Sequence, residues 1–299
     1  MKPVQIGRIR VRKFAESAAD IPIPIATFVG LTPERFASLQ ADLDPRCFVP
    51  ETLMLPFSMH TFVIETGSKV ILVDTCNGND KHRTGVMSGS HLLNNNYLEK
   101  LAALGLRPED VDLVLCTHLH SDHVGWNTRL DNGRWVPTFP KARYLMSRAE
   151  VDSYAALAPE HPQAQLVLEA FNDSVLPVIA AGQADLIEHG HIVEREIEDR
   201  VWIEGAPGHT PGSVMLHTKC GGAHGLFTGD VFHHPIQIQD PSLHLGVDDD
   251  LEKALAVRKR LVDKYADSPT RLFAAHFPDP TAGCIVTGKQ GLRFRFLET

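Results

Sequence analysis

A predicted buried strand of this chain ends directly before a run of histidine and aspartate residues, and this arrangement limits what the chain can fold into. Residues 111–117 have the apolar character of a β-strand covered on both faces. The chain then supplies four potential metal ligands within six positions: His118, His120, Asp122 and His123. Residues two apart on an extended chain point the same way, so His118 and His120 can bind one ion. A turn into a helix would bring the next two to a second ion; the alternative is a polar loop in which Asp122 only caps a helix.

Three later residues of the same types follow other predicted strands. His209 lies in the glycine- and proline-rich stretch 205–213, which favours a tight loop. Asp230 ends the run Leu-Phe-Thr-Gly-Asp, and His276 ends Leu-Phe-Ala-Ala-His. Singly, each is compatible with a structural role in a loop, a turn or the core. As an ordered set of imidazole and carboxylate donors they indicate a site for divalent cations, zinc first, with manganese, iron or cobalt as alternatives.

Strand and helix patterns recur in both halves of the chain. The predicted strands cover residues 61–66, 70–74, 111–117, 142–147, 201–204, 214–218, 225–228, 271–275, 284–287 and 292–297. The predicted helices cover residues 35–43, 97–104, a segment from 148, 164–181 and 251–265. This alternation predicts an α/β protein, an αββα sandwich of two mixed β-sheets flanked by helices. We expect a single domain over residues 1–299, with residues 1–60 as an N-terminal extension.

Composition limits the partners. The 299 residues include 29 Lys+Arg and 37 Asp+Glu, and the formal net charge of −8 argues against a nucleic acid or an anionic membrane surface. No apolar run approaches the roughly 18 residues of a membrane span. The first twenty residues lack the apolar region of a secretory signal, and the five scattered cysteines have no Cys-x-x-Cys spacing. These features predict a cytoplasmic protein with reduced thiols.

At the seven ligand positions the chain resembles the metallo-β-lactamase superfamily, whose pattern is His-x-His-x-Asp-His followed by a distant His, an Asp and a last His. The resemblance covers about residues 61–276 and implies the metallo-β-lactamase fold. It implies a dinuclear centre in which His118, His120 and His209 bind one metal, Asp122, His123 and His276 bind the other, and Asp230 bridges both. Asp74, at the end of its predicted strand, matches an upstream aspartate that supports the ligands from behind.

The implied chemistry is hydrolysis by water. Two adjacent cations lower the pKa of a bridging water, so that hydroxide exists near neutral pH, and they polarise the bond that it attacks. No cysteine is needed as a nucleophile, and Cys116 is expected to fill the core. Asp122 is either a proton shuttle to the leaving group or only a ligand.

Within the superfamily the chain resembles the lactonase, carboxylesterase and phosphotriesterase branch. Acyl-homoserine lactonases of the best-known type place a tyrosine three residues after the bridging aspartate, whereas this chain has His233, as phosphotriesterase-type members do. His233, or else His234, is expected to hydrogen-bond the attacked oxygen. Candidates for the wall of the pocket flank the ligands: Trp126, Phe232 and Phe277, with Phe57 or Met59 before the first hairpin.

The expected substrate is a small neutral ester or lactone, with phosphotriesters as a further class. Two other activities of the superfamily remain as alternatives: a mononuclear iron sulfur dioxygenase and a glyoxalase II-like thioester hydrolase. Glyoxalase II resembles the chain in all seven ligands but ends in a helical domain, where this chain has a predicted hairpin. Residues 1–60 are expected to cap the pocket or to form the arm of a homodimer.

Overall fold

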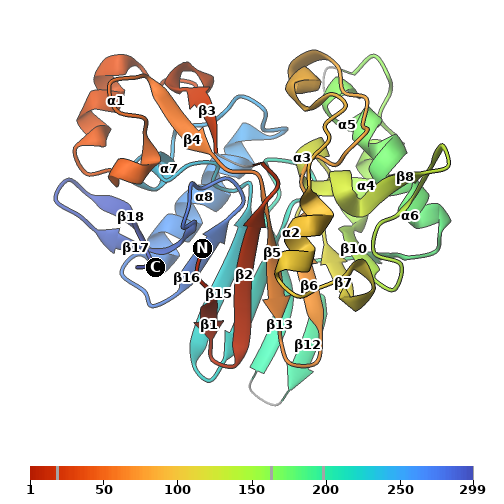
Figure 1. Ribbon diagram of the computed structural model, residues 1–299. Helices are drawn as coiled ribbons and strands as arrows, with labels where there is room; N and C mark the ends of the chain where they lie inside the picture. Colours follow the sequence, from red (N-terminus) through yellow and green to blue (C-terminus); the bar gives the residue numbers. More distant parts are fainter. Residues whose placement is uncertain (18–19, 162–163, 197–198, 299) are drawn as a thin grey trace. The chain divides into compact units, whose positions relative to one another are not determined.

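The computed structural model describes residues 1–17, 20–161, 164–196 and 199–298 (Figure 1). The chain forms two compact units. The N-terminal unit contains Pro3–Ala18 and Met59–Glu188, and the C-terminal unit contains Met1–Lys2, Ala19–Ser58 and His189–Thr299. Within the described residues, each unit contains one seven-stranded mixed sheet. In this same part of the chain, no helix is both long enough and apolar enough to cross a membrane.

The sheet of the N-terminal unit has the strand order β1-β2-β5-β6-β7-β10-β11. Its strands are β1 (Val4–Ile6), β2 (Ile9–Ala15), β5 (His60–Glu65), β6 (Val70–Val73), β7 (Leu113–Leu115), β10 (Arg143–Ser147) and β11 (Ala184–Ile187). Pairing is antiparallel from β1 to β6 and parallel from β6 to β11. Because β6 and β7 are parallel, with Val73 opposite Leu115, the residues that follow these strands leave the sheet at the same edge.

Helices cover one face of this sheet. The unit contains α2 (Tyr97–Ala103), α3 (Ser121–Val124), α4 (Arg148–Ala155), α5 (Ala164–Ala170) and α6 (Leu176–Ala180), and a small hairpin of β8 (Thr128–Asp131) and β9 (Arg134–Pro137). Shorter turns of helix lie at Gly85–Ser90, Pro108–Asp110 and Gly125–Asn127. Tyr97, Val151 and Val167 from three of the helices enter one hydrophobic cluster with Val63 and Val114 of the sheet.

The helix predicted over residues 164–181 is interrupted. A π-helical turn, Phe171–Val175, separates α5 from α6. Pro177, near the start of α6, has no backbone N–H and cannot continue a regular hydrogen-bond ladder from α5. The prediction of helical structure there is confirmed, but the segment is not one continuous α-helix.

The sheet of the C-terminal unit has the order β12-β13-β14-β15-β16-β17-β18. Its strands are β12 (Ile192–Glu196), β13 (Asp199–Gly205), β14 (Val214–Cys220), β15 (Ala223–Gly229), β16 (Arg271–Ala274), β17 (Ala282–Thr287) and β18 (Leu292–Phe296). Gly221 and Gly222 both have positive φ, which lets a two-residue turn join β14 to β15, as the sequence predicted. The β15–β16 pair is parallel, so Asp230 and His276 follow strands that end at one edge.

The remaining elements of this unit pack on its sheet. They are β3 (Ile21–Pro24), Ile25–Thr27, α1 (Pro33–Gln40), Pro45–Cys47, β4 (Met54–Phe57), α7 (Ile236–Gln239) and α8 (Leu251–Tyr265). The side chain of Thr32 caps α1, and that of Asp250 caps α8. Leu261 and Tyr265 on α8 join Leu226 and Ile285 in a second hydrophobic cluster.

Most predicted elements are confirmed, and the first sixty residues contain the main surprise. Residues 4–6 and 9–15 form β1 and β2 of the N-terminal sheet, beside β5 (Figure 1), where the sequence analysis assigned no strand. A single domain, and a role of residues 1–60 as a pocket cap or dimer arm, stay predictions.

Candidate metal centre

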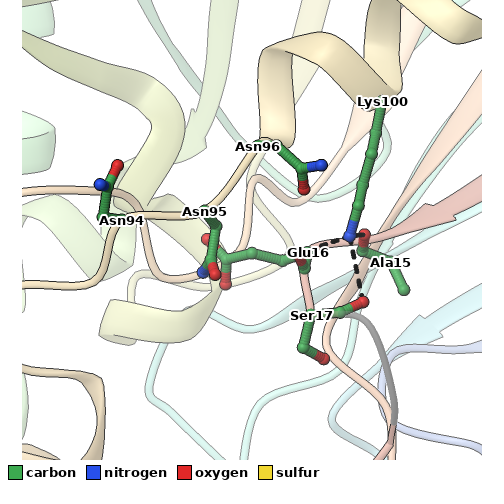
Figure 2. Close-up of a pocket in the computed structure, with 7 residues that line it drawn as sticks. All are labelled: Ala15, Glu16, Ser17, Asn94, Asn95, Asn96 and Lys100. Atoms are coloured by element: carbon green, nitrogen blue, oxygen red, sulfur yellow. Dashed lines mark hydrogen bonds between the residues drawn. The ribbon is translucent and has the colours of Figure 1, made fainter.

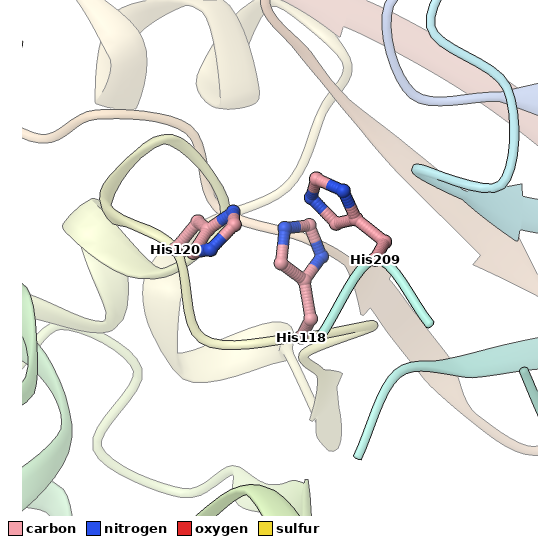
Figure 3. Close-up of side chains that lie close together, drawn as sticks. All are labelled: His118, His120 and His209. Atoms are coloured by element: carbon pink, nitrogen blue, oxygen red, sulfur yellow. The ribbon is translucent and has the colours of Figure 1, made fainter. Parts of the chain in front are cut away.

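The four candidate ligands of the N-terminal unit follow β7 in the chain, as the sequence predicted. The chain is extended at His120, and α3 begins at the next residue. The rings of His118 and His120 lie edge to face with centroids 4.6 Å apart (Figure 3). The ring centroids of His118 and His123 are 3.9 Å apart. Nε2 of His123 lies 3.7 Å from Oδ2 of Asp122. These four donors therefore form one local group.

Asp74 holds this group from the end of β6. Its carboxylate accepts hydrogen bonds from the backbone N–H of Thr117 at 2.7 Å and from the Thr117 hydroxyl at 2.8 Å. It also lies 2.8 Å from Nδ1 of His123. A proton on Nδ1 leaves the lone pair of His123 on Nε2, the atom on the side of Asp122. The parallel pairing of β6 and β7 is what places Asp74 beside Thr117.

A buried glutamate that was not predicted from the sequence connects, by hydrogen bonds, the loop after β6 with the segment after α3. Glu16, at the end of β2, accepts hydrogen bonds from Asn77 N, Gly78 N and the indole N–H of Trp126. The side chain of Glu16 is almost fully buried. Since β2 itself was not predicted, no sequence signal connected Glu16 with residues sixty positions or more away.

In the C-terminal unit, the predicted ligands converge on Asp230. Its Oδ2 lies 3.3 Å from Nε2 of His276, 3.5 Å from Nε2 of His209 and 3.2 Å from Nε2 of His233. The donor atoms of His209, Asp230 and His233 all lie within 4.8 Å of one another, and all three residues are buried. Three imidazole nitrogens directed at one buried carboxylate form a donor set typical of a divalent cation site.

Two of these histidines are held through their other ring nitrogen. Nδ1 of His209, which comes from the loop between β13 and β14 (Figure 3), lies 2.9 Å from Oδ1 of Asp248. Nδ1 of His276 lies 3.1 Å from the backbone oxygen of Ser58, and the ring of Phe57 stacks on His276 with centroids 4.2 Å apart. Burial by itself would raise the pKa of Asp248, but the His209 hydrogen bond and neighbouring positive groups hold that pKa below its usual value.

These contacts fit a metal centre. In His123, His209 and His276, Nδ1 has a carboxylate or carbonyl partner, and Nε2 is the nitrogen left to bind a cation. Ligand histidines in metalloproteins are oriented by this same pattern of contacts. The donors are imidazole and carboxylate, which suits zinc and the harder divalent ions. The five cysteines are buried thiols, and none belongs to a donor group formed by the residues that the structure describes.

The two histidines after Asp230 have different surroundings. Nε2 of His234 donates to the backbone oxygen of Cys47, and Nδ1 accepts from the backbone N–H of Ile236. Burial lowers the pKa of His234 to about 3, so this side chain is a neutral part of the packing. His233 lies beside Asp230 instead, and of the two it remains the candidate for contact with substrate.

The three predicted pocket residues are buried in the hydrophobic clusters. Trp126 stacks on Tyr97 in the N-terminal unit, and Phe232 and Phe277 belong to the cluster of the C-terminal unit. Their place in a substrate pocket stays a prediction. Phe57, one of the two further residues named from the sequence, contacts a predicted ligand, because its ring stacks on His276.

A pocket of about 510 Å³ in the N-terminal unit is lined by none of the predicted site residues (Figure 2). Its lining consists of Ala15, Glu16, Ser17, Asn94, Asn95, Asn96 and Lys100. The ammonium group of Lys100 donates to the backbone oxygens of Ala15, Glu16 and Ser17. This cation therefore anchors the chain after β2.

Comparison with known proteins places this geometry in context. The profile of the metallo-beta-lactamase superfamily matches residues 56–276. An N-acyl homoserine lactonase of Bacillus cereus is 25% identical over 245 residues, which cover 78% of this chain and 86% of that protein. A Bacillus sp. protein of the same name is 26% identical over 246 residues, with the same coverage of each chain.

Solved structures resemble the chain over nearly its whole length. AidC, described as a dizinc quorum-quenching lactonase, has a TM-score of 0.77 at 20% identity and covers 100% of this chain and 97% of its own. AbOPH, a hydrolase of the beta-lactamase superfamily, has a TM-score of 0.77 at 22% identity, with 99% and 97% covered. At these identities the likeness shows the fold, and the prediction of a metallo-β-lactamase fold with two mixed sheets is confirmed.

Proposed function

Because the chain belongs to the metallo-beta-lactamase superfamily, we propose that it is a lactonase-type hydrolase with two divalent metal ions, which cleaves a small ester or lactone bond. The observation that carries the proposal is the surroundings of Asp230. Its Oδ2 lies 3.5 Å from Nε2 of His209 and 3.3 Å from Nε2 of His276. In the proposed ligand set these two histidines would hold different metal ions, and the short distances from Asp230 to both support its assignment as a shared ligand.

One ion is assigned to His118, His120 and His209, and the other to Asp122, His123 and His276. The local grouping of the first donors after β7 and the convergence of the later ones on Asp230 support this assignment. Zinc is the first expectation for both positions because the donors are imidazole and carboxylate.

The metal ions, when bound, would supply hydroxide near neutral pH and polarise the bond under attack. The chain's own residues supply the rest. Asp74 and Asp248 orient His123 and His209 through Nδ1. Asp122 is assigned the transfer of a proton to the leaving group, because a carboxylate can accept and release a proton at this position. His233, beside Asp230, is assigned to the attacked oxygen of the substrate.

A lactone is the preferred substrate class, because the two curated relatives carry the name N-acyl homoserine lactonase and cover 78% of the chain. His233, at the position where that type has a tyrosine, supports phosphotriesters as a second class. The five buried cysteines have free thiols, which is typical of proteins from a reducing compartment. We therefore propose that the protein is located in the cytoplasm.

The first experiment is elemental analysis of protein purified without chelator, together with assays on lactones, aryl esters, thioesters, phosphotriesters and a β-lactam. We expect two zinc-like ions per chain and lactone or ester turnover that a chelator abolishes and added metal restores. Hydrolysis that persists in metal-free protein would refute the proposal. A single iron ion with oxygen consumption on glutathione persulfide would identify the dioxygenase, and a clear preference for thioesters would identify the glyoxalase II type.

The variant Asp230→Ala tests the bridging role. We expect it to lose at least one of the two metal ions and to lower hydrolysis by about 10³-fold or more, since both ions depend on this carboxylate. Asp131→Ala, which removes an exposed carboxylate of β8, serves as the control and should retain both properties. Full metal content and activity in the Asp230 variant would contradict the assignment.

A further inference from the structure

The N-terminal end of α8 is built against the loop that contains His209. The backbone N–H of Asp249 donates to the carbonyl of His209 at 3.1 Å, and that of Asp250 donates to the carbonyl of Gly208 at 2.9 Å. The loop between β13 and β14 is therefore hydrogen-bonded to the residues that begin α8. This contact joins segments forty residues apart in the sequence.

Gly208 shows how close this contact is. Its φ of +142° lies in a region that residues with a side chain rarely adopt. A Cβ atom on Gly208 would lie 2.2 Å from the backbone nitrogen of Ala254 and 2.8 Å from the carbonyl carbon of Lys253. Both atoms belong to the first turn of α8, so the loop before His209 rests directly on the helix backbone.

Asp248, just before α8, contacts the imidazole itself. Its Oδ1 lies 2.9 Å from Nδ1 of His209, and both side chains are at least 96% buried. A carboxylate can only accept a hydrogen bond, so this contact requires the proton of His209 to be on Nδ1. Nε2, which is 3.5 Å from Asp230, then carries the lone pair.

Arg258, on the second turn of α8, lies beside Asp248 and stabilises its position. Its guanidinium is fully buried and donates to the backbone oxygens of Val231, Leu243 and Pro241. One of its nitrogens lies 3.9 Å from Oδ2 of Asp248. A buried arginine requires such partners, because an uncompensated charge in the interior is costly. Arg258 thus binds the backbone of Val231, the residue after Asp230, and lies close to the carboxylate of Asp248.

We propose that Asp248, supported by Arg258, is a positioning residue that sets the tautomer and ring orientation of His209. The inference rests on the proposed function in one respect, namely that His209 is a metal ligand. Hydrogen bonding to the carboxylate keeps Nε2 unprotonated and makes it a stronger donor to a cation. The N-terminal end of α8 fixes the loop between β13 and β14, and Asp248 fixes the ring of His209.

The test uses Asp248→Asn, in which an amide of nearly the same size replaces the carboxylate. The amide has no charge and can turn its NH₂ group toward the ring, which favours the other tautomer. Asp263→Asn is the matched control, because Asp263 lies on the same helix, is exposed and forms a surface ion pair with Lys259. Asp248→Glu restores a carboxylate and tests rescue.

Two readouts are independent of catalysis. Nitrogen-15 NMR of the metal-free protein reports which nitrogen of His209 carries the proton, and competition with a chromophoric chelator reports metal affinity. We expect the Nδ1–H form in the wild type and in Asp263→Asn. Asp248→Asn should show a substantial Nε2–H form and a loss of about 10- to 100-fold in affinity for the ion at His209. Asp248→Glu should recover part of both.

The outcomes separate this inference from the proposed function. An Nε2–H form in the wild type, or the same tautomer and affinity in Asp248→Asn as in the wild type, would overturn the positioning role. A wild type that binds no metal would refute the proposed function and the ligand role of His209, while the NMR result would still decide whether Asp248 sets the tautomer. If Asp248→Asn does not fold, the Asp248→Glu and wild-type spectra decide the question.

Discussion

At the level of individual residues, hydrogen-bond acceptors hold the rings of three of the proposed ligand histidines. Nδ1 of His123, His209 and His276 is held by Asp74, by Asp248 and by the backbone oxygen of Ser58, respectively. Each contact selects one tautomer of a neutral imidazole. For His209 and His276, the arrangement explains why each ring presents Nε2 rather than Nδ1 to the carboxylate of Asp230.

Asp74→Ala should weaken both stability and metal binding. The change removes the acceptor of three buried donors, two on Thr117 and one on His123. We expect the free energy of unfolding to fall by about 2–4 kcal/mol, because buried donors that lose their acceptor are costly. Urea unfolding in the presence of a chelator measures this loss without a metal contribution.

The control for this prediction is Asp131→Ala, which removes an exposed carboxylate of β8. It should change the free energy of unfolding by less than about 1 kcal/mol. A loss below about 1 kcal/mol in Asp74→Ala would show that water replaces the carboxylate and that Asp74 does not organise the loop.

At the scale of elements, the loops after neighbouring parallel strands are in direct contact. The segment after β6 pairs with the segment after β7, since Thr75 N donates to His123 O and Gly125 N donates to Cys76 O. A Cβ atom on Gly125 would lie 1.8 Å from the backbone oxygen of Asn77. The ligand-bearing loop is thus fixed by a backbone contact that admits only glycine.

Gly125→Ala should displace this loop. The added methyl group meets backbone atoms of Asn77, which cannot move aside as a flexible side chain would. We expect a loss of about 3 kcal/mol or more in the free energy of unfolding and weaker metal binding. Gly89→Ala is the matched control, because a Cβ there meets nothing within 4 Å, and it should be nearly neutral. Equal stability of the two variants, measured by thermal and urea unfolding, would contradict the close contact.

At the scale of the whole molecule, a partly buried chain of polar side chains in the C-terminal unit links stability to pH. His217 lies 3.0 Å from both Glu204 and His224, and Nδ1 of His224 lies 3.1 Å from the Thr270 hydroxyl. Burial, and then the charges of His217 and Lys264, lower the pKa of His224 to about 4. Hydrogen bonds from His217 and Arg260 lower the pKa of Glu204 to about 2.

Both shifts make acid destabilising. Between pH 6.5 and about 4, the unfolded chain binds a proton at His224 that the folded protein does not, so the free energy of unfolding decreases as the pH falls. Glu204 adds a further decrease from pH 4.5 down to about 2. We expect His224→Gln to reduce the loss between pH 6.5 and 4 by on the order of 1 kcal/mol, a figure that allows for the partial exposure of the ring.

Urea unfolding at pH 7, 5.5 and 4.5, with chelator present throughout, measures this dependence apart from protonation of a metal-loaded site. His191→Gln removes an exposed histidine and should leave the wild-type pH dependence intact. The same slope in His224→Gln as in the wild type would show that His224 is protonated equally in the folded and unfolded states.

Most of the elements after residue 60, and the order of the candidate donors, could be predicted from the sequence alone, because both depend on local chemistry. Apolar strands such as β7 and β16 end on polar side chains, and the amphipathic helix α8 follows an acidic cap. Each of these patterns spans only a few neighbouring residues, so it can be read from the sequence without information on tertiary contacts. The seven candidate ligands could be proposed in this way: His118, His120, Asp122, His123, His209, Asp230 and His276.

The distant groups that support these candidate donors became visible in the folded structure. Asp248 contacts a histidine 39 residues away, and the Ser58 carbonyl contacts one 218 residues away. The folded structure also distinguished His233, beside Asp230, from His234, which is bound to Cys47. Such contacts arise from strand pairing and from helix packing between remote segments, and no local spacing in the sequence encodes them.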